Sequence, residues 1–185
     1  MGDAQTRHLG KMLIKACLAG DAAAVSRLLP AGGTELDLSG PDFQEPTCKS
    51  SALIVAATFG HTDIVRIMLE RARNTAVDYV DAQPVPATAM MTACQFHHVG
   101  IIRLLAARGA NVNVNLNFTC QLGQRRQTLL SIALLPMCSN GVPISLAESL
   151  RDPDPGAELA TVRELLQLGA GTLPAPATLF GTVLH

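Results

Sequence analysis

The sequence predicts an all-α solenoid built from about four helix-turn-helix repeats. A string of small and apolar residues recurs along the chain, with Ala16, Ala56, Ala93 and Ala133 at equivalent places in its four copies. A second apolar string follows each copy, as expected for the second helix of a pair. Aromatic residues make up only 3% of the chain. Its core is therefore expected to consist of Ala, Leu, Ile and Val in thin layers of closely packed helices.

Residues 51–70 contain the clearest copy of the repeated unit. Residues 52–57 are small or apolar and predict a short first helix, Gly60 ends it, and residues 64–69 predict a second apolar helix. Such a pair buries one face on itself and leaves another face that needs a neighbour. About three or more stacked units are therefore required for stability.

The copies follow one another at spacings of 40, 37 and 40 residues. The first helices are expected in KMLIKACLAGD, SALIVAATFGH, TAMMTACQFHH and TLLSIALLP, and the second in AVSRLL, IVRIML, IIRLLA and TVRELL. We divide a single domain, residues 1–185, into repeats at about 10–45, 46–82, 83–122 and 123–172. Residues 173–185 are interpreted as a partial fifth repeat or a cap, because residues 178–183 are similar to the start of another first helix.

Gly60-His61, residues 64–69 and the GANVN string at 109–113 carry a family pattern. They resemble the ankyrin repeat, whose unit has a T-P-L-H-x-A-A first helix, a G-H turn, a V-V-x-x-L-L second helix and a G-A-D-V-N lead into a β-turn finger. The resemblance covers residues 11–170 and implies a helix-pair solenoid with β-turn fingers that binds another protein. No copy carries the proline or the histidine of T-P-L-H.

Enlarged loops are expected between the helices, because the spacings exceed the roughly 33 residues of the minimal unit. Residues 30–48, 73–86 and 115–126 are interpreted as enlarged fingers or loops. The longest insertion, residues 136–158, contains several prolines and separates the two helices of the fourth repeat.

The ends of the stack carry polar residues at positions that are apolar in the middle repeats. Lys15 and Arg27 predict that the first repeat is an end cap with an outward polar face. Glu164 occupies the slot of Arg27 in the fourth repeat and suggests a second cap, whereas the similarity within residues 178–183 suggests continuation.

Charge and cysteine content restrict the partners and the compartment. A formal net charge of −1 gives no reason to expect nucleic acid. Five cysteines without a C-x-x-C pair favour a reducing intracellular setting, cytoplasmic, nuclear or both. No apolar run approaches the roughly 18 residues of a membrane span, and no membrane partner is expected. Gly2 fits the bare N-myristoylation pattern, but the acidic Asp3 is a poor context for it.

Cys94, His97 and His98 form the one cluster that suggests a metal or a nucleophile. A structural zinc site needs four ligands, and no second Cys/His pair stands at a suitable spacing. Cys94 instead aligns with the small residues Cys17 and Ala57, and His98 aligns with the turn residue His61. We expect a packed thiol and structural imidazoles, no metal, no cofactor and no enzymatic activity.

The candidate binding residues lie at the ends of the first helices, where the ankyrin resemblance places a concave groove. These partner-binding candidates are Leu18, Thr58, Phe59, Gln95, Phe96 and Leu135. Phe59 and Phe96 stand at equivalent places in adjacent repeats and would form an aromatic contact strip if exposed. The alternative is that both rings pack on each other and on the neighbouring turn.

The predicted function is a non-catalytic protein-interaction module that binds its partner through the groove and the fingers. An alternative is the substrate-recognition part of a ubiquitin-ligase adaptor. That alternative rests on residues 50–70 and the capped first repeat, which are similar to the amino-terminal ankyrin region of Fem-type receptors. No cullin-adaptor box is visible in the sequence.

Overall fold

The computed structural model describes residues 3–34, 37–39, 43–44, 50–72, 75–81, 86–120, 123–134 and 156–171. In this part of the chain the helices form four pairs. They are α1 (Asp3–Ala19) with α2 (Ala22–Leu28), α3 (Ala52–Thr58) with α4 (Thr62–Arg71), α5 (Ala89–Gln95) with α6 (Val99–Ala107), and α7 (Leu129–Leu134) with α9 (Ala157–Gln167). The arrangement confirms the predicted all-α solenoid of helix pairs.

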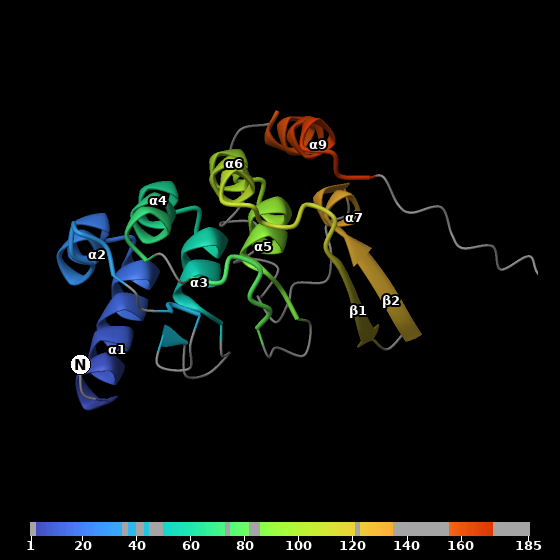
Figure 1. Ribbon diagram of the computed structural model, residues 1–185. Coiled ribbons are helices and arrows are strands. Elements are labelled where there is room, and N and C mark those ends of the chain that lie inside the picture. Colours follow the sequence, from blue (N-terminus) through green and yellow to red (C-terminus); the bar gives the residue numbers. More distant parts are fainter. Residues whose placement is uncertain are drawn as a thin grey trace, which may run out of the picture.

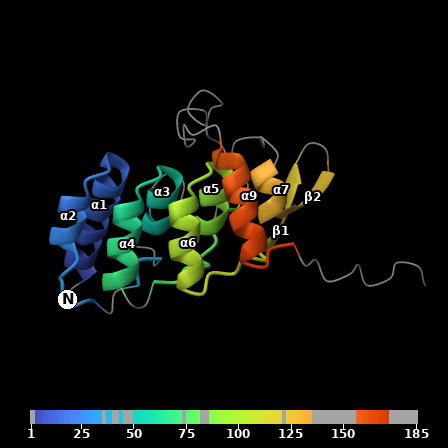
Figure 2. The same cartoon turned by 90° about the horizontal axis from the view of Figure 1, so that it is seen from above.

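The pairs stack side by side in two rows. Figure 1 shows the first helices α1, α3, α5 and α7 in one row beneath the second helices α2, α4, α6 and α9. Viewed from above, the pairs follow one another in chain order along a single line (Figure 2). Each first helix therefore contacts the first helix of the next repeat, as each second helix contacts the next second helix.

The inner first helices begin at Ser or Thr side chains, which replace the missing T-P-L-H motif. The Ser51 hydroxyl accepts a hydrogen bond from the Ile54 amide at 3.3 Å, and the Thr88 hydroxyl accepts one from Met91 at 3.2 Å. Such caps satisfy backbone donors that have no partner within the helix. The helices consequently begin sharply at Ala52 and Ala89 without a proline.

Helix α1 is longer than the sequence pattern predicts. The pattern placed the first helix from about residue 11, whereas α1 begins at Asp3. Residues 4–12 include Ala, Gln, Arg, Leu, Lys and Met, all good helix formers, so the helix extends beyond the part that packs in the stack.

Small residues in the C-terminal half of each first helix allow the repeats to approach closely. Ala16, Ala56, Ala93 and Ala133 are all buried, and Ala56 and Ala93 are fully enclosed. Larger apolar residues fill the space between the rows, including Leu53, Met68, Met90, Ile102 and Leu105. The core is thus a continuous aliphatic layer that runs from repeat to repeat.

The finger between the third and fourth pairs is a β-hairpin. Strands β1 (Asn115–Cys120) and β2 (Gly123–Thr128) pair in antiparallel register, with Cys120 opposite Gly123. The sequence indicated an enlarged finger or loop at residues 115–126 but not its strands. A two-residue connection between short segments is typical of a hairpin, and ladder hydrogen bonds satisfy the backbone of the enlarged finger.

Polar contacts tie neighbouring repeats together at the finger end of the helices. The Arg71 guanidinium donates to the carbonyls of Ser26 and Leu29 at 2.7 and 2.8 Å, at the carboxyl end of α2 in the preceding repeat. The Asp78 carboxylate accepts a hydrogen bond from the backbone amide of Asn111 at 2.9 Å. These bonds complement the end of a helix and fix the relative position of two successive fingers.

The first repeat has the polar outward face expected of an end cap, because Lys15 and Arg27 are exposed. The interpretation of Glu164 as a second outward cap is wrong. Its carboxylate accepts a hydrogen bond from Arg103 of α6 at 2.7 Å, and Glu164 is buried against the third repeat. A charged group at this depth needs a partner, and the preceding helix supplies one.

Enlarging the buried alanine of the second repeat tests the close approach of the first helices. We expect Ala56→Leu to destabilise the fold by about 1–3 kcal/mol, because the enclosed site cannot take a larger side chain without displacing its neighbours. The matched control Ala23→Leu, at an exposed position of α2, should change the free energy of unfolding by less than about 0.5 kcal/mol. Urea unfolding of both variants measures the difference; equal effects would contradict this account of the packing.

Candidate protein-binding surface

Three equivalent residues form a row across the ends of the first helices. Leu18, Thr58 and Gln95 each lie in the last turn of α1, α3 and α5, which pack side by side. Leu18 is 45% exposed, and Thr58 and Gln95 are half-buried. We call these three residues the helix-end row. The fourth predicted member, Leu135, lies outside the described residues.

The two phenylalanines that follow the helix-end row have different environments. Phe59 is half-buried, and its ring stacks on His61 with the ring centres 6.0 Å apart and the planes at 10°. Phe96 is only 2% exposed, with its ring centre 6.3 Å from that of His98. The expectation of two exposed aromatic rings in register is therefore wrong for Phe96. Burying such a ring is favourable by about 1.5–3 kcal/mol, which favours packing over exposure.

The turns that follow these phenylalanines interlock from one repeat to the next. Gly20 and Gly60 both have a positive φ, near +70°, a conformation that glycine adopts readily. The imidazole of His61 lies against Gly20, and that of His98 lies against Gly60. A Cβ atom on either glycine would come within 2.7 Å of the histidine Cε1 atom. Glycine is thus required both by the backbone and by the neighbouring ring. We call each such contact a glycine–histidine interlock.

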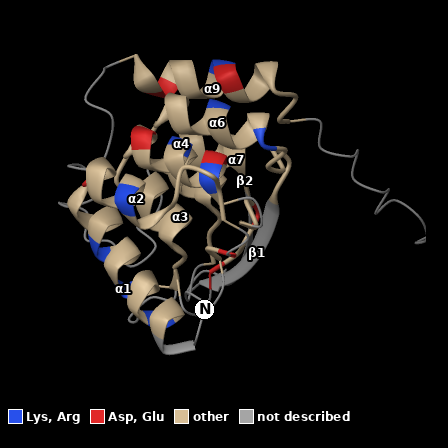
Figure 3. Ribbon diagram, turned by 60° about the vertical axis from the view of Figure 1, so that its left-hand side comes forward, with Lys and Arg blue, Asp and Glu red and all other residues tan. Residues whose placement is uncertain are grey.

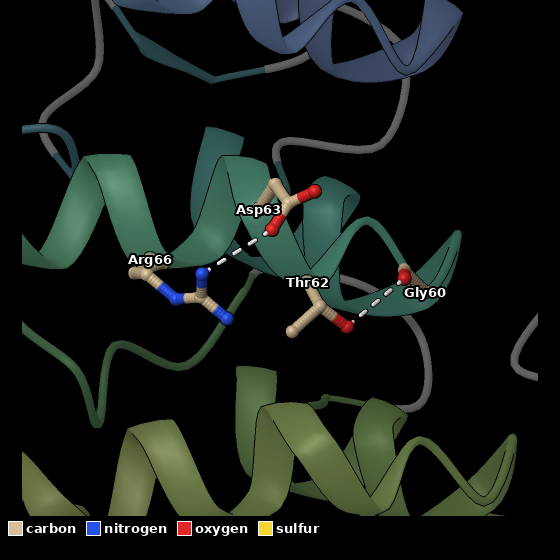
Figure 4. Close-up of polar contacts among 4 residues, drawn as sticks. All are labelled: Gly60, Thr62, Asp63 and Arg66. Atoms are coloured by element: carbon tan, nitrogen blue, oxygen red, sulfur yellow. Dashed lines mark hydrogen bonds and ion pairs between the residues drawn. The ribbon is translucent and has the colours of Figure 1, made fainter.

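Polar contacts stabilise the second turn, which joins α3 to α4. The Thr62 hydroxyl donates to the Gly60 carbonyl at 3.4 Å, and on the outer side of α4 Arg66 pairs with Asp63 at 3.5 Å (Figure 4). A ring nitrogen of His98 lies 3.4 Å from the Thr58 carbonyl oxygen. The third turn is therefore bonded directly to the end of the second repeat's first helix, beside the helix-end row.

The third turn, which joins α5 to α6, has a histidine at the position of Gly20 and Gly60. His97 has a φ of 63° and is buried. Histidine enters this left-handed region more readily than most residues, although at a cost that glycine avoids. The sequence showed this replacement, but only the structure shows that the backbone keeps the glycine conformation.

The cysteine and histidine cluster has the packed geometry that its alignment with small residues predicted. Cys17 and Cys94 are fully buried, and burial raises the pKa of Cys17 to about 12 and that of Cys94 further still. Both thiols are consequently protonated near neutral pH and unsuited to nucleophilic attack. Burial also lowers the pKa of His61 below its ordinary value. Across the described residues, no group of three His, Cys, Asp or Glu side chains is placed to hold a metal ion.

Finger residues were not among the sequence candidates, although the structure places one apolar side chain there. Val80 is 40% exposed and precedes the buried Asp81. The Asp81 carboxylate accepts hydrogen bonds from the Ser50 hydroxyl and the Ala87 amide, both at 2.8 Å. The exposed valine therefore stands on a firmly anchored finger. The bond between Asp81 and Ser50 joins residues far apart in the chain, so the sequence does not reveal this anchor.

Charge is distributed unevenly over the two rows of helices. Helices α3, α5 and α7 contain no charged residue, whereas Lys, Arg, Asp and Glu lie on α1 and on the second helices (Figure 3). Thr58 and Gln95, the members of the helix-end row on α3 and α5, accordingly lie on helices without charged side chains. None of the described helices is both long and apolar enough to cross a membrane.

The fold defines a repeat protein of stacked helix pairs with finger loops. A family model described as ankyrin repeats, with three copies of the unit, matches residues 13–116. This match covers more than half of the chain, and the chain belongs to the ankyrin-repeat family. Proteins of this family are generally protein–protein interaction modules and typically non-catalytic. A search of curated protein sequences gave no significant match.

The difference between the two phenylalanines can be measured directly. We expect Phe96→Ala to destabilise the protein by about 3–5 kcal/mol, because it removes an enclosed ring. Phe59→Ala is the matched control at the equivalent place one repeat earlier. It should lower the free energy of unfolding by a smaller amount, about 0.5–3 kcal/mol, as ordinary substitutions do. Thermal or urea unfolding separates the two; a larger loss for Phe59→Ala would refute the assignment.

The glycine–histidine interlock predicts a specific coupling. Gly60→Ala forces alanine into the left-handed region, at about 1–2 kcal/mol, and adds a clash with His98 of about 1–3 kcal/mol. Gly109→Ala has a similar positive φ but open space around it, so only the first cost applies. The double variant Gly60→Ala/His98→Ala should recover the clash energy in a double-mutant cycle. Additive effects in that cycle would show that the interlock contributes nothing.

Proposed function

We propose that this chain is a non-catalytic adaptor that binds another protein through the helix-end row, Phe59 and the finger around Val80. The observation that carries the proposal is the recurrence of accessible side chains at one equivalent position in three successive repeats. Because the repeats stack in a line, we expect these side chains to form a single strip.

Rigidity supports this proposal. The strip lies on helices held by interlocked turns, by the His98 contact with Thr58, and by the Arg71 bonds to the preceding repeat. Association costs free energy for every group that must be ordered, and a surface that is already ordered loses less. The scaffold can therefore bind with few contacts, provided that these contacts are well packed.

The chemistry of the strip indicates the kind of partner. Within the strip, Leu18 is an exposed apolar group, while Thr58 and Gln95 add neutral polar side chains. Val80 offers a separate exposed apolar group on the finger. Phe59 is the aromatic residue beside the row, and aromatic residues often dominate the energy of protein interfaces. With no charge on α3 or α5, the strip suits a neutral or apolar segment of a protein better than a phosphate backbone.

We place this adaptor inside the cell, in the cytoplasm or the nucleus, where its thiols stay reduced. Proximity labelling in the native cell would identify the partner. Binding of that purified partner can then be measured by calorimetry. The ubiquitin-ligase alternative makes a distinct prediction for the labelling, because elongin or cullin subunits would be recovered with the chain. Their absence would favour a scaffold without a ligase.

Introducing positive charges into the helix-end row should weaken binding of the partner. We expect the triple variant Leu18→Lys, Thr58→Lys, Gln95→Lys to weaken binding by at least about tenfold, or about 1.4 kcal/mol. Lysine near the carboxyl end of a helix is compatible with folding. The control Ala23→Lys adds a charge at an exposed site on α2, in the other row, and should leave the affinity unchanged. Unaltered affinity of a folded triple variant would overturn the proposed surface.

A further inference from the structure

Within the described residues, both helices of the fourth repeat carry exposed apolar side chains. Leu134 of α7 is 54% exposed, and Leu159 and Leu166 of α9 are 71% and 57% exposed. Leu130 and Val162, on the same two helices, are half-buried. We call these five residues the end face. Its character differs from that of the first repeat, where Lys15 and Arg27 provide a polar surface.

Equivalent positions in the earlier repeats show what normally covers such a face. The positions equivalent to Leu134 are Cys17, Ala57 and Cys94, and each is 0% exposed. Those equivalent to Leu130 are Leu13, Leu53 and Met90, which are at most 1% exposed. In the earlier repeats, the next first helix packs against the helix that carries these residues. The α7 part of the end face therefore has the apolar side chains that another first helix covers in the earlier repeats.

The chain itself contains a suitable segment. Residues 178–185, TLFGTVLH, repeat the pattern of residues 128–135, TLLSIALL. Thr178 aligns with Thr128, whose hydroxyl accepts a hydrogen bond from the Ser131 amide at 3.1 Å at the start of α7. Ser51 and Thr88 cap α3 and α5 in the same way. Phe180 aligns with Leu130, and Leu184 aligns with Leu134.

The position of the chain after α9 makes this segment available to α7. Gly171 lies against Leu130, because a Cβ atom on the glycine would be 2.7 Å from Leu130 Cδ1. The chain therefore leaves the fourth repeat beside the uncovered row. Six residues lie between Gly171 and Thr178. An extended chain spans about 3.3–3.6 Å per residue, so this connection can reach farther than the distance of about 8–10 Å between packed helices.

We propose that residues 178–185 dock on α7 as the first helix of a fifth repeat and cover Leu130 and Leu134. The segment carries no Lys, Arg, Asp or Glu, which matches the uncharged surface of α7. Burial of these apolar groups is the driving force, as in the earlier repeats. The proposal concerns the α7 row and does not account for the exposed Leu159 and Leu166 of α9.

A tryptophan reporter tests this docking, because the chain contains no tryptophan. In the full chain, Phe180→Trp should give blue-shifted emission that acrylamide quenches weakly. Leu173→Trp, outside the repeated pattern, is the matched control and should emit as an exposed indole. Adding Leu134→Asp to Phe180→Trp should shift the emission to the red, whereas adding Leu166→Asp, at a similarly exposed site on α9, should not.

Identical emission from the two reporters, or a blue shift insensitive to Leu134→Asp, would overturn the proposal. A blue shift that disappears on dilution together with a dimer in size-exclusion chromatography would mean that a second copy covers the face, which also overturns it. Hydrogen exchange in the unmodified chain provides a measurement free of the substitution. Amides of residues 181–185 should exchange more slowly than those of residues 172–177, and uniform fast exchange would contradict docking.

Discussion

Burial of each repeat's apolar face by the next repeat is the interaction on which the whole structure depends. A single pair of short helices, such as α3 and α4, cannot enclose its own side chains, and only stacking makes Ala56 and Met68 inaccessible. The close approach needs small residues at equivalent positions of the first helices. It leaves little tolerance for larger ones, because protein interiors are packed nearly as densely as organic crystals. The linear stack and its limited tolerance of change thus have one physical origin.

The same constraint separates the surfaces that are free to bind from those that are not. Side chains directed at a neighbouring repeat are enclosed, so accessible side chains lie at the helix ends, on the fingers, on the outer side of the second helices and on the last repeat. Leu18 and Val80 are accessible because they lie at the margins of the stack. Leu134 is accessible for a different reason, since the described residues place no further helix against α7. Two kinds of exposed apolar surface therefore coexist, one suited to a partner and one suited to completing the stack.

Local repetition made most of the fold predictable. The spacing of the alanines and the turn glycines Gly20 and Gly60 indicated the helix pairs, since each depends on chemistry within one repeat. The features that could not be predicted depend on contacts between distant segments. Phe59 and Phe96 look identical in the sequence, yet only Phe96 is enclosed. Glu164 resembled an outward cap until its bond to Arg103, which joins residues far apart in the chain, was seen.

The glycine–histidine interlock also restricts how such a protein can evolve by duplication. A turn histidine fits only where the preceding repeat presents a glycine, so the two positions must change together although they lie in different repeats. His97 ends this pairing. The turn histidine of a repeat placed after it would meet the His97 side chain instead of a glycine. The second and third repeats are therefore not interchangeable modules. Exchanging their order would place an imidazole against an imidazole, and the chain order of the repeats is fixed by the shape of their turns.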